Sequence, residues 1–155
     1  YNCGNPFPYP TYSIATPATC ARMSFLLMWQ YGIAGNLYWC ADVNNDLRQS
    51  KGINVGSDGR GDGQLVYRDV QGRTASSMRL EMIRDGVEDY EYLWLLNERM
   101  QAARTQDRDV TAAETLLGIP DEVARDIAHY THDPQPLEHY REQVARAIEQ
   151  FGESR

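Results

Sequence analysis

The sequence has little positive charge, a single lysine and no long apolar run. Its 155 residues carry 15 basic and 22 acidic side chains, for a net charge of −7, and the one lysine is Lys51. Proteins that bind nucleic acid gather Lys and Arg against the phosphate backbone, so this balance excludes nucleic acid as an expected partner. Because about 18 consecutive apolar residues are needed to cross a bilayer, we also expect no membrane span.

Cysteine and histidine are also sparse, which argues against a metal centre. The three cysteines show no CxxC or zinc-type spacing, so we favour free, packed thiols, with one disulfide still open. These are Cys3, Cys20 and Cys40. The three histidines do not share one helix face, and Asp42-x-Asn44-x-Asp46 departs from a calcium loop at Leu47 and Ile53. The sequence therefore predicts no metal and no cofactor.

A helix and a buried strand are expected early in the chain. A capping hydroxyl followed by Pro17, and later Gly32, are typical helix ends, which predicts a helix over 17–31. Arg22 is its only charge, so the helix should be buried on more than one face. Arg22 itself should then meet a carboxylate or backbone carbonyls. The aromatic-rich run 35–40 predicts a short buried strand.

A long loop and a long helix follow. Residues 42–63 are polar and rich in glycine, and Asp62 among them favours a turn over an ion site. The helix predicted over 76–104 carries an apolar stripe at spacings of three and four that should face a core. Its members are Leu80, Ile83, Val87, Tyr90 and Trp94. Toward the C-terminus, further helices are expected over 120–131 and 137–151.

The alternation of strand and helix is typical of a parallel sheet, which predicts an α/β fold. Two strands cannot form such a sheet alone, so we expect further strands from upstream sequence or from a partner chain. The chain also begins with Tyr1 instead of Met and shows no signal-peptide pattern. We therefore expect that this sequence begins partway through a longer protein.

Four blocks of sequence carry a family resemblance. They are Tyr1-Asn-Cys-Gly4 with the proline-rich loop behind it, Arg22 to Trp29 with Gly35-Asn-Leu-Tyr-Trp39, Gly61-Asp-Gly-Gln-Leu-Val-Tyr67, and Ser77-Met-Arg-Leu-Glu-Met-Ile-Arg-Asp-Gly-Val-Glu-Asp-Tyr-Glu-Tyr-Leu93. Together they resemble the domain of unknown function 4091 (DUF4091) of family 123 glycoside hydrolases (GH123), and the tail from Tyr130 resembles that family's ending. The long block that ends at Leu93 is the most specific of them.

The resemblance implies the C-terminal portion of a (β/α)8 TIM-type barrel followed by a helical C-terminal extension. Residues 1–104 would supply the last two β/α units with the long loop 42–63, and residues 105–155 the extension of the same domain. In such barrels the active site lies at the C-terminal ends of the strands. The expected partners are therefore a carbohydrate substrate and the remainder of the barrel, from upstream sequence or another chain.

The chemistry implied is retaining hydrolysis of β-linked N-acetylhexosamine, specifically N-acetylgalactosamine, with the sugar's own acetamido group as nucleophile. The family uses an adjacent Asp-Glu pair, which we expect upstream of Tyr1. Glu88-Asp89 has the reversed order and lies within a helix, where Arg84 can pair with Glu88. We therefore expect no catalytic residue in this chain, which would be inactive alone. Structural roles are expected for Arg22, Arg79, Arg84, Glu88 and Asp89.

Sugar-binding residues are expected at the ends of strands. Trp39 would stack on a sugar face, with a core position as the equal alternative, and Tyr1, Asn2 and Asp42 would reach hydroxyls. Two other functions stay open, namely a non-catalytic carbohydrate-binding or scaffolding barrel segment and a mainly helical interaction module. The sequence identifies neither the sugar and linkage, nor the oligomeric state, nor the compartment, for which a secreted or periplasmic parent protein is one option.

Overall fold

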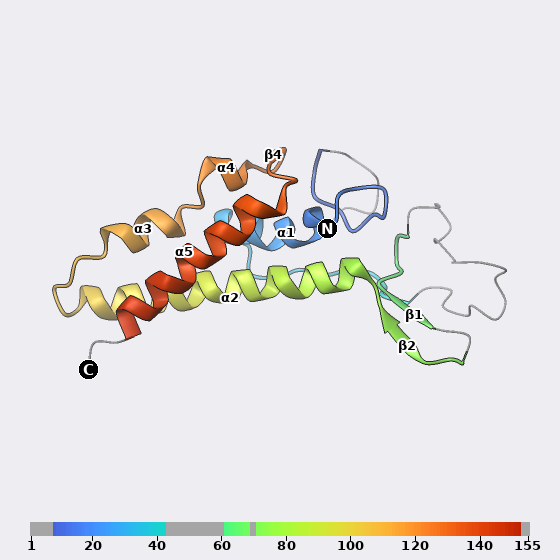
Figure 1. The fold of residues 1–155 in the computed structure, drawn as a ribbon, viewed down its shortest axis with the longest axis horizontal. Coiled ribbons are helices and arrows are strands. Elements are labelled where there is room, and N and C mark those ends of the chain that lie inside the picture. Colours follow the sequence, from blue (N-terminus) through green and yellow to red (C-terminus); the bar gives the residue numbers. More distant parts are fainter. Residues whose placement is uncertain (1–7, 43–60, 69–70, 153–155) are drawn as a thin grey trace.

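Three helices that pack on one another organise the structure. In the computed structural model, the described residues are 8–42, 61–68 and 71–152. Helix α2 (Met78–Arg104) runs along most of the molecule, and α1 (Thr19–Gln30) and α5 (Pro134–Gly152) both pack against it (Figure 1). None of the helices in the described ranges is long and apolar enough to span a bilayer.

Helix α1 lies where the sequence predicts it, but the expected capping hydroxyl is wrong. The N-cap residue is Ala18, and the Thr16 hydroxyl donates to the Ser13 carbonyl at 2.9 Å. Gly32 follows its last turn with φ of 64°, in the left-handed region that glycine adopts without strain. The N–H of Gly32 donates to the Trp29 carbonyl at 3.1 Å, which satisfies a carbonyl at the helix end. Most of the helix is buried, including Arg22, Met23 and Leu26. The prediction of burial on more than one face is therefore confirmed.

Helix α2 begins where predicted, with the Ser77 hydroxyl accepting a hydrogen bond from the Leu80 N–H at 3.1 Å. The predicted apolar stripe is wrong in part, because Val87 and Trp94 remain 42% and 47% exposed. The buried face is rotated by one residue along the helix. It consists of Arg79, Gly86, Asp89, Leu93, Leu96, Met100 and Ala103. Polar residues and a glycine occupy buried positions that a hydrophobic pattern does not reveal.

The strands are short and antiparallel. Strand β1 (Val66–Arg68) pairs with β2 (Thr74–Ser76), with Val66 opposite Ser76. The buried strand expected over 35–40 is wrong, since this segment has no strand partner among the described residues and Leu37 is 75% exposed. A strand is held by hydrogen bonds to a neighbour, and the nearest pairing is an isolated bridge at Asp42. The described residues form a mixed α/β structure, mostly helical, with small sheets and no closed barrel.

The C-terminal part also departs from the prediction. Its elements are α3 (Thr111–Leu117), α4 (Asp121–Ala124), β3 (Arg125–Asp126), β4 (His129–Tyr130) and α5. The helix expected over 120–131 is wrong beyond its first turn, because the Asp126 carboxylate accepts the backbone N–H groups of Ala128 and His129, both at 2.9 Å, and so forms a tight turn. Pro134 lies within the first turn of α5 instead of preceding it.

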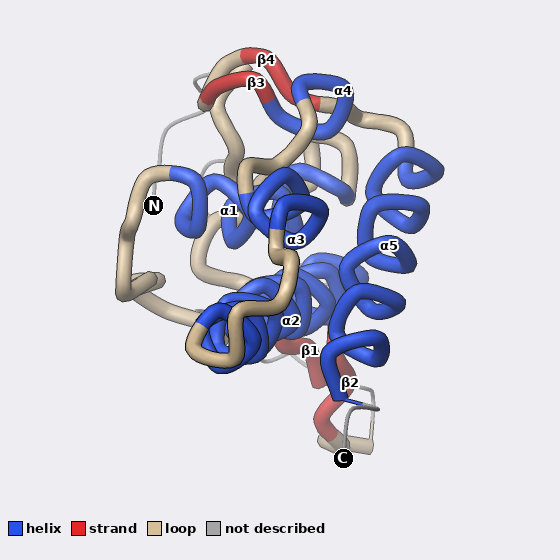
Figure 2. Tube along the Cα trace, turned by 90° about the vertical axis from the view of Figure 1, so that its left-hand side faces the viewer, coloured by secondary structure: helices blue, strands red, loops and turns tan. Residues whose placement is uncertain are grey.

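One apolar core joins both halves of the chain. Its residues come mainly from α1, α2, α3, α4 and α5, and Figure 2 shows how these helices are arranged. Its most deeply buried large side chains come from α1, α2, α4 and α5 and are Met23, Leu26, Leu93, Leu96, Val123, Leu137 and Val144. Residues before and after position 104 thus bury their apolar surface against each other, and this shared core fixes where α2 presents its N-terminal end.

Helices α1 and α2 pack closely at Gly86, which makes a first prediction. A Cβ there would lie 2.7 Å from the Arg22 carbonyl oxygen and 3.0 Å from its Cα, and backbone atoms cannot rotate away. Gly86→Ala should lower the free energy of unfolding by about 1–3 kcal/mol, although alanine is the better helix former by about 1 kcal/mol. Chemical denaturation measures this change in the free energy of unfolding. Gly152→Ala, which meets nothing within 4 Å, serves as control and should be neutral, and an equally neutral Gly86→Ala would contradict the close packing.

Candidate functional site

Trp39 and Tyr38 are held together by the carboxylate of Asp62. The Trp39 indole nitrogen donates to Oδ2 at 3.1 Å, and the Tyr38 hydroxyl donates to Oδ1 at 3.0 Å. The Gly63 N–H in turn donates to the Tyr38 hydroxyl at 2.6 Å. Trp39 nevertheless remains 52% exposed. One carboxylate therefore fixes the orientation of an indole that stays open to solvent.

A second support comes from the segment before α1. The ring of Tyr12 meets the ring of Tyr38 edge to face, with 5.0 Å between centroids. Asn36 donates from Nδ2 to the Tyr12 hydroxyl at 2.7 Å, and Tyr12 itself is buried. A mainly apolar groove of about 480 Å³ opens beside these residues, lined in part by Tyr9, Tyr12 and Leu37. The Tyr12 side chain therefore both contacts the Tyr38 ring and lines this groove.

One buried guanidinium joins the loops that carry these supports. Arg79, the second residue of α2, is 5% exposed. Its Nη1 donates to the carbonyls of Tyr12 and Gly61, at 2.6 and 2.7 Å. Its Nη2 donates to the Gln64 carbonyl and, at 2.9 Å, to the Tyr67 hydroxyl. A Cβ on Gly61 would lie 2.8 Å from Arg79 Nη2, and φ there is +75°, so the loop can pass this guanidinium only as glycine.

The residues predicted to bind sugar do not all fall in this cluster. Trp39 lies at its exposed edge. Tyr1 and Asn2 are outside the described residues. Asp42 is exposed, and its backbone pairs with Gln64 in the isolated bridge.

The structure adds two residues that sequence reasoning did not assign to the site. Asp62 lies in a Gly-Asp-Gly run that favours a turn, and nothing local indicates that its carboxylate meets Tyr38 and Trp39. Tyr12 is one of ten tyrosines, and only the fold brings it against Tyr38. In both cases the partners are more than twenty residues apart, so spacing carried no signal.

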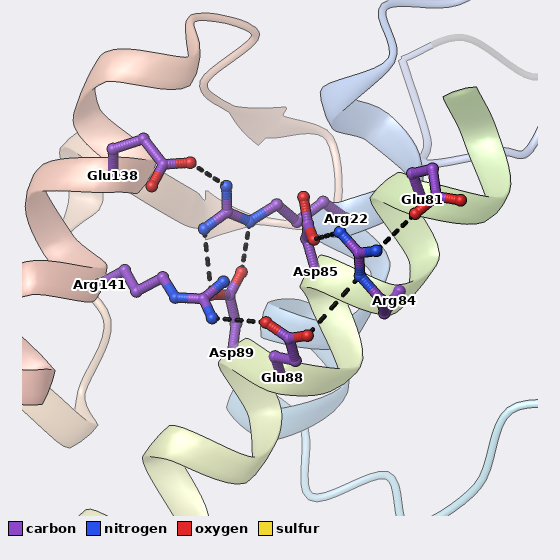
Figure 3. Close-up of polar contacts among 8 residues, drawn as sticks. All are labelled: Arg22, Glu81, Arg84, Asp85, Glu88, Asp89, Glu138 and Arg141. Atoms are coloured by element: carbon purple, nitrogen blue, oxygen red, sulfur yellow. Dashed lines mark hydrogen bonds and ion pairs between the residues drawn. The ribbon is translucent and has the colours of Figure 1, made fainter. Parts of the chain in front are cut away.

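A separate set of residues forms an ion-pair network that joins α1, α2 and α5 (Figure 3). Arg22 donates from Nε and Nη2 to both carboxylate oxygens of Asp89, at 2.5 and 3.0 Å, and from Nη1 to Glu138. Arg141 lies 3.3 Å from Asp89 and 2.7 Å from Glu88. Burial opposes the charge of Arg22, but its carboxylate partners hold its pKa above the ordinary value.

These contacts show what Glu88-Asp89 does in the described structure. Arg84 lies 3.6 Å from Glu88, one turn earlier on α2, so the expected ion pair is present. Both oxygens of Asp89 face arginines inside the helix interface, whereas a general acid must reach a substrate atom. In the described part of the chain, no group of three or more His, Cys, Asp or Glu side chains is arranged to hold a metal ion.

A comparison with models of known protein families gives a match. The family model described as "Glycoside hydrolase 123, catalytic domain" matches residues 1–96, which is more than half of the chain and includes Trp39, Asp62 and Arg79. The resemblance to family 123 glycoside hydrolases is therefore confirmed over residues 1–96. A comparison with curated proteins found no match.

The buried ion pair generates a second prediction. Asp89→Ala leaves Arg22 buried beside the half-exposed Glu138 alone, and breaking such a pair costs about 3–5 kcal/mol of the free energy of unfolding. Denaturant unfolding of the intact protein measures this. The control is Glu114→Ala, which breaks the solvent-exposed pair with Arg104 and should cost about 1 kcal/mol or less. An Asp89→Ala protein that kept its stability but lost all enzymatic turnover would show a catalytic role instead.

The environment of Tyr38 generates a third prediction. Burial raises the pKa of its phenol to about 12, and the neighbouring Asp62 carboxylate acts in the same direction. An unfolded tyrosine ionises near 10, so this group's contribution to stability is present below about pH 10 and is lost as the pH rises toward 12. Asp62→Asn should lower the pKa of Tyr38, as followed by tyrosinate absorbance with Tyr38→Phe as reference. An unchanged titration would mean that Asp62 does not act on this hydroxyl.

Proposed function

This chain belongs to the glycoside hydrolase 123 family, and from that premise we propose that it supplies the sugar-binding wall of an enzyme acting on β-linked N-acetylhexosamine, in particular N-acetylgalactosamine. One observation carries the proposal. The Trp39 indole is held through its N–H by Asp62, yet half of its surface is exposed. Fixed, exposed aromatic faces are what the apolar C–H faces of sugars stack on.

The reaction proposed is substrate-assisted retaining hydrolysis. The acetamido oxygen of the sugar attacks the anomeric carbon, the glycosidic C–O bond breaks, and the leaving oxygen takes a proton from a general acid. Water then opens the cyclic intermediate with retention of configuration. The Asp-Glu pair that orients the acetamido group and supplies the proton is proposed to lie upstream of Tyr1. Trp39, with Tyr1, Asn2 and Asp42, is proposed to hold the sugar in place.

We further propose that the rest of a (β/α)8 barrel covers the exposed apolar side chains. Residues 35–40 belong to no helix or strand and have no strand partner among the described residues. Leu37 on this segment and Val87 and Trp94 on α2 are large, apolar and exposed. Contact with the rest of the barrel would bury these three side chains. Residues 1–104 would then form the last two β/α units, and residues 105–155 their helical extension.

A second candidate is a carbohydrate-binding or scaffolding segment without catalysis. It is favoured by the engagement of Glu88 and Asp89 in arginine ion pairs, which leaves the binding surface near Trp39 without an acid from that helix. The helical content of the described residues suits the third hypothesis, an interaction module, but that hypothesis gives no reason for the family match or for the fixed indole.

Two measurements test the proposal and separate the candidates. Trp39→Ala in the intact protein should weaken binding of N-acetylgalactosamine by about 10- to 100-fold in calorimetric titration, because the stacking surface is lost. Trp39→Phe keeps an aromatic face and is the matched variant, for which about tenfold or less is expected. Equal affinity of Trp39→Ala and the unaltered protein would sink the sugar-binding role.

Hydrolysis of a chromogenic β-N-acetylgalactosaminide is the second measurement. The intact protein should release the chromophore, whereas the isolated 155-residue chain should not, since its acid pair is proposed to lie elsewhere. Turnover by the isolated chain would refute that assignment. Sugar binding without any turnover by the intact protein would favour the non-catalytic candidate.

A further inference from the structure

We propose that Arg79 is the positioning residue of the Trp39 site, in that its guanidinium holds both loops that fix the indole without itself touching sugar. The inference rests on the proposed sugar-binding function, but the control of Trp39 by Arg79 can be measured with no sugar present. The sequence alone assigned Arg79 only a structural role.

Two short paths lead from Arg79 to the Tyr38–Trp39 pair. On the first, Arg79 donates to the Gly61 carbonyl at 2.7 Å, and the next residue, Asp62, accepts the hydrogen bonds of Tyr38 and Trp39. On the second, Arg79 donates to the Tyr12 carbonyl at 2.6 Å, and the Tyr12 ring packs edge to face on Tyr38. Both supports of the pair therefore depend on the same guanidinium.

The geometry calls for arginine. The donors of a guanidinium spread over a rigid planar fork, so Nη1 and Nη2 can reach carbonyls from two separate loops at once. A lysine ammonium has three donors at one point on a flexible stem and cannot span the same set. The loop is packed so closely here that a Cβ on Gly61 would lie 2.8 Å from Nη2.

The location of Arg79 also indicates a tertiary role. It lies in the first turn of α2, where the positive end of the helix dipole disfavours a cation by about 0.3–1 kcal/mol. It is also almost fully buried, which is costly for a charge unless its donors are satisfied. Local preferences thus oppose arginine at this position. Its contacts to Tyr12, Gly61 and Gln64 outweigh them, and a helix anchored in the core gives these loops a rigid base.

The experiment follows the indole N–H resonances of the intact, ¹⁵N-labelled protein, with Trp39→Phe assigning the Trp39 signal. In Arg79→Lys this signal should move toward its position in Asp62→Ala, because the Asp62 loop is released. Trp29, which donates to the Leu117 carbonyl at 3.0 Å, is the internal reference and should not move. The dissociation constant for N-acetylgalactosamine should rise about tenfold in the same variant.

The matched control is Arg22→Lys. Arg22 is the other buried arginine among the described residues, and it is 3% exposed. It should lower the thermal unfolding midpoint and leave the Trp39 signal in place, which separates positioning from general destabilisation. If Arg79→Lys does not fold, Tyr67→Phe removes one acceptor of Arg79 and should shift the Trp39 signal in the same direction by less.

The two proposals fail in different ways. A Trp39 signal unmoved in folded Arg79→Lys, or in Tyr67→Phe where the lysine variant does not fold, overturns the positioning role whatever the sugar affinity. An unaltered affinity in Trp39→Ala overturns the proposed function, even if the signal moves.

Discussion

The crossing of α1 and α2 is the constraint on which the rest of the structure depends. At this crossing Gly86 removes the side chain that would separate the helices, and Arg22 meets both oxygens of Asp89. A buried ion pair adds little net stability but is costly to break, so its main effect is to select one arrangement over others. With Arg22 and Asp89 in contact and Gly86 facing α1, α2 has one possible rotation about its axis.

That rotation determines where the candidate site is built. Arg79, Gly86 and Asp89 are separated by seven and three residues, so they share a face of α2. The rotation that buries Asp89 against α1 therefore also turns Arg79 inward, toward the carbonyls of Tyr12 and Gly61. Scaffold and site are linked through one helix face. The C-terminal part, outside the family match, adds Glu138 and Arg141 to the ion-pair network and so supports the same rotation.

Sequence reasoning found α1 and α2 well and the strand over 35–40 poorly, for a physical reason. The ends of α1 and α2 are marked by local chemistry, such as the left-handed Gly32 and the capping Ser77. The stripe Leu80–Trp94 was misplaced by one residue because Arg79 and Asp89 look like solvent-facing positions until their partners are known. Residues 35–40 have the composition of a strand, but a strand exists only with a neighbour to pair with.

The sequence by itself determined the family and the two main helices, because these depend on residue order and on spacings within one helix. It also led to the expectation that Glu88-Asp89 is not the acid pair. It also gave Trp39 as a candidate sugar-binding residue, with a core position as the equal alternative. Only the tertiary structure decided that Asp62 orients Trp39, that Tyr12 supports Tyr38, and that Arg79 joins their loops. These contacts join residues that are far apart in the chain, and backbone carbonyls, which every residue carries, are the acceptors of Arg79. No pattern of side chains in the sequence can therefore reveal them.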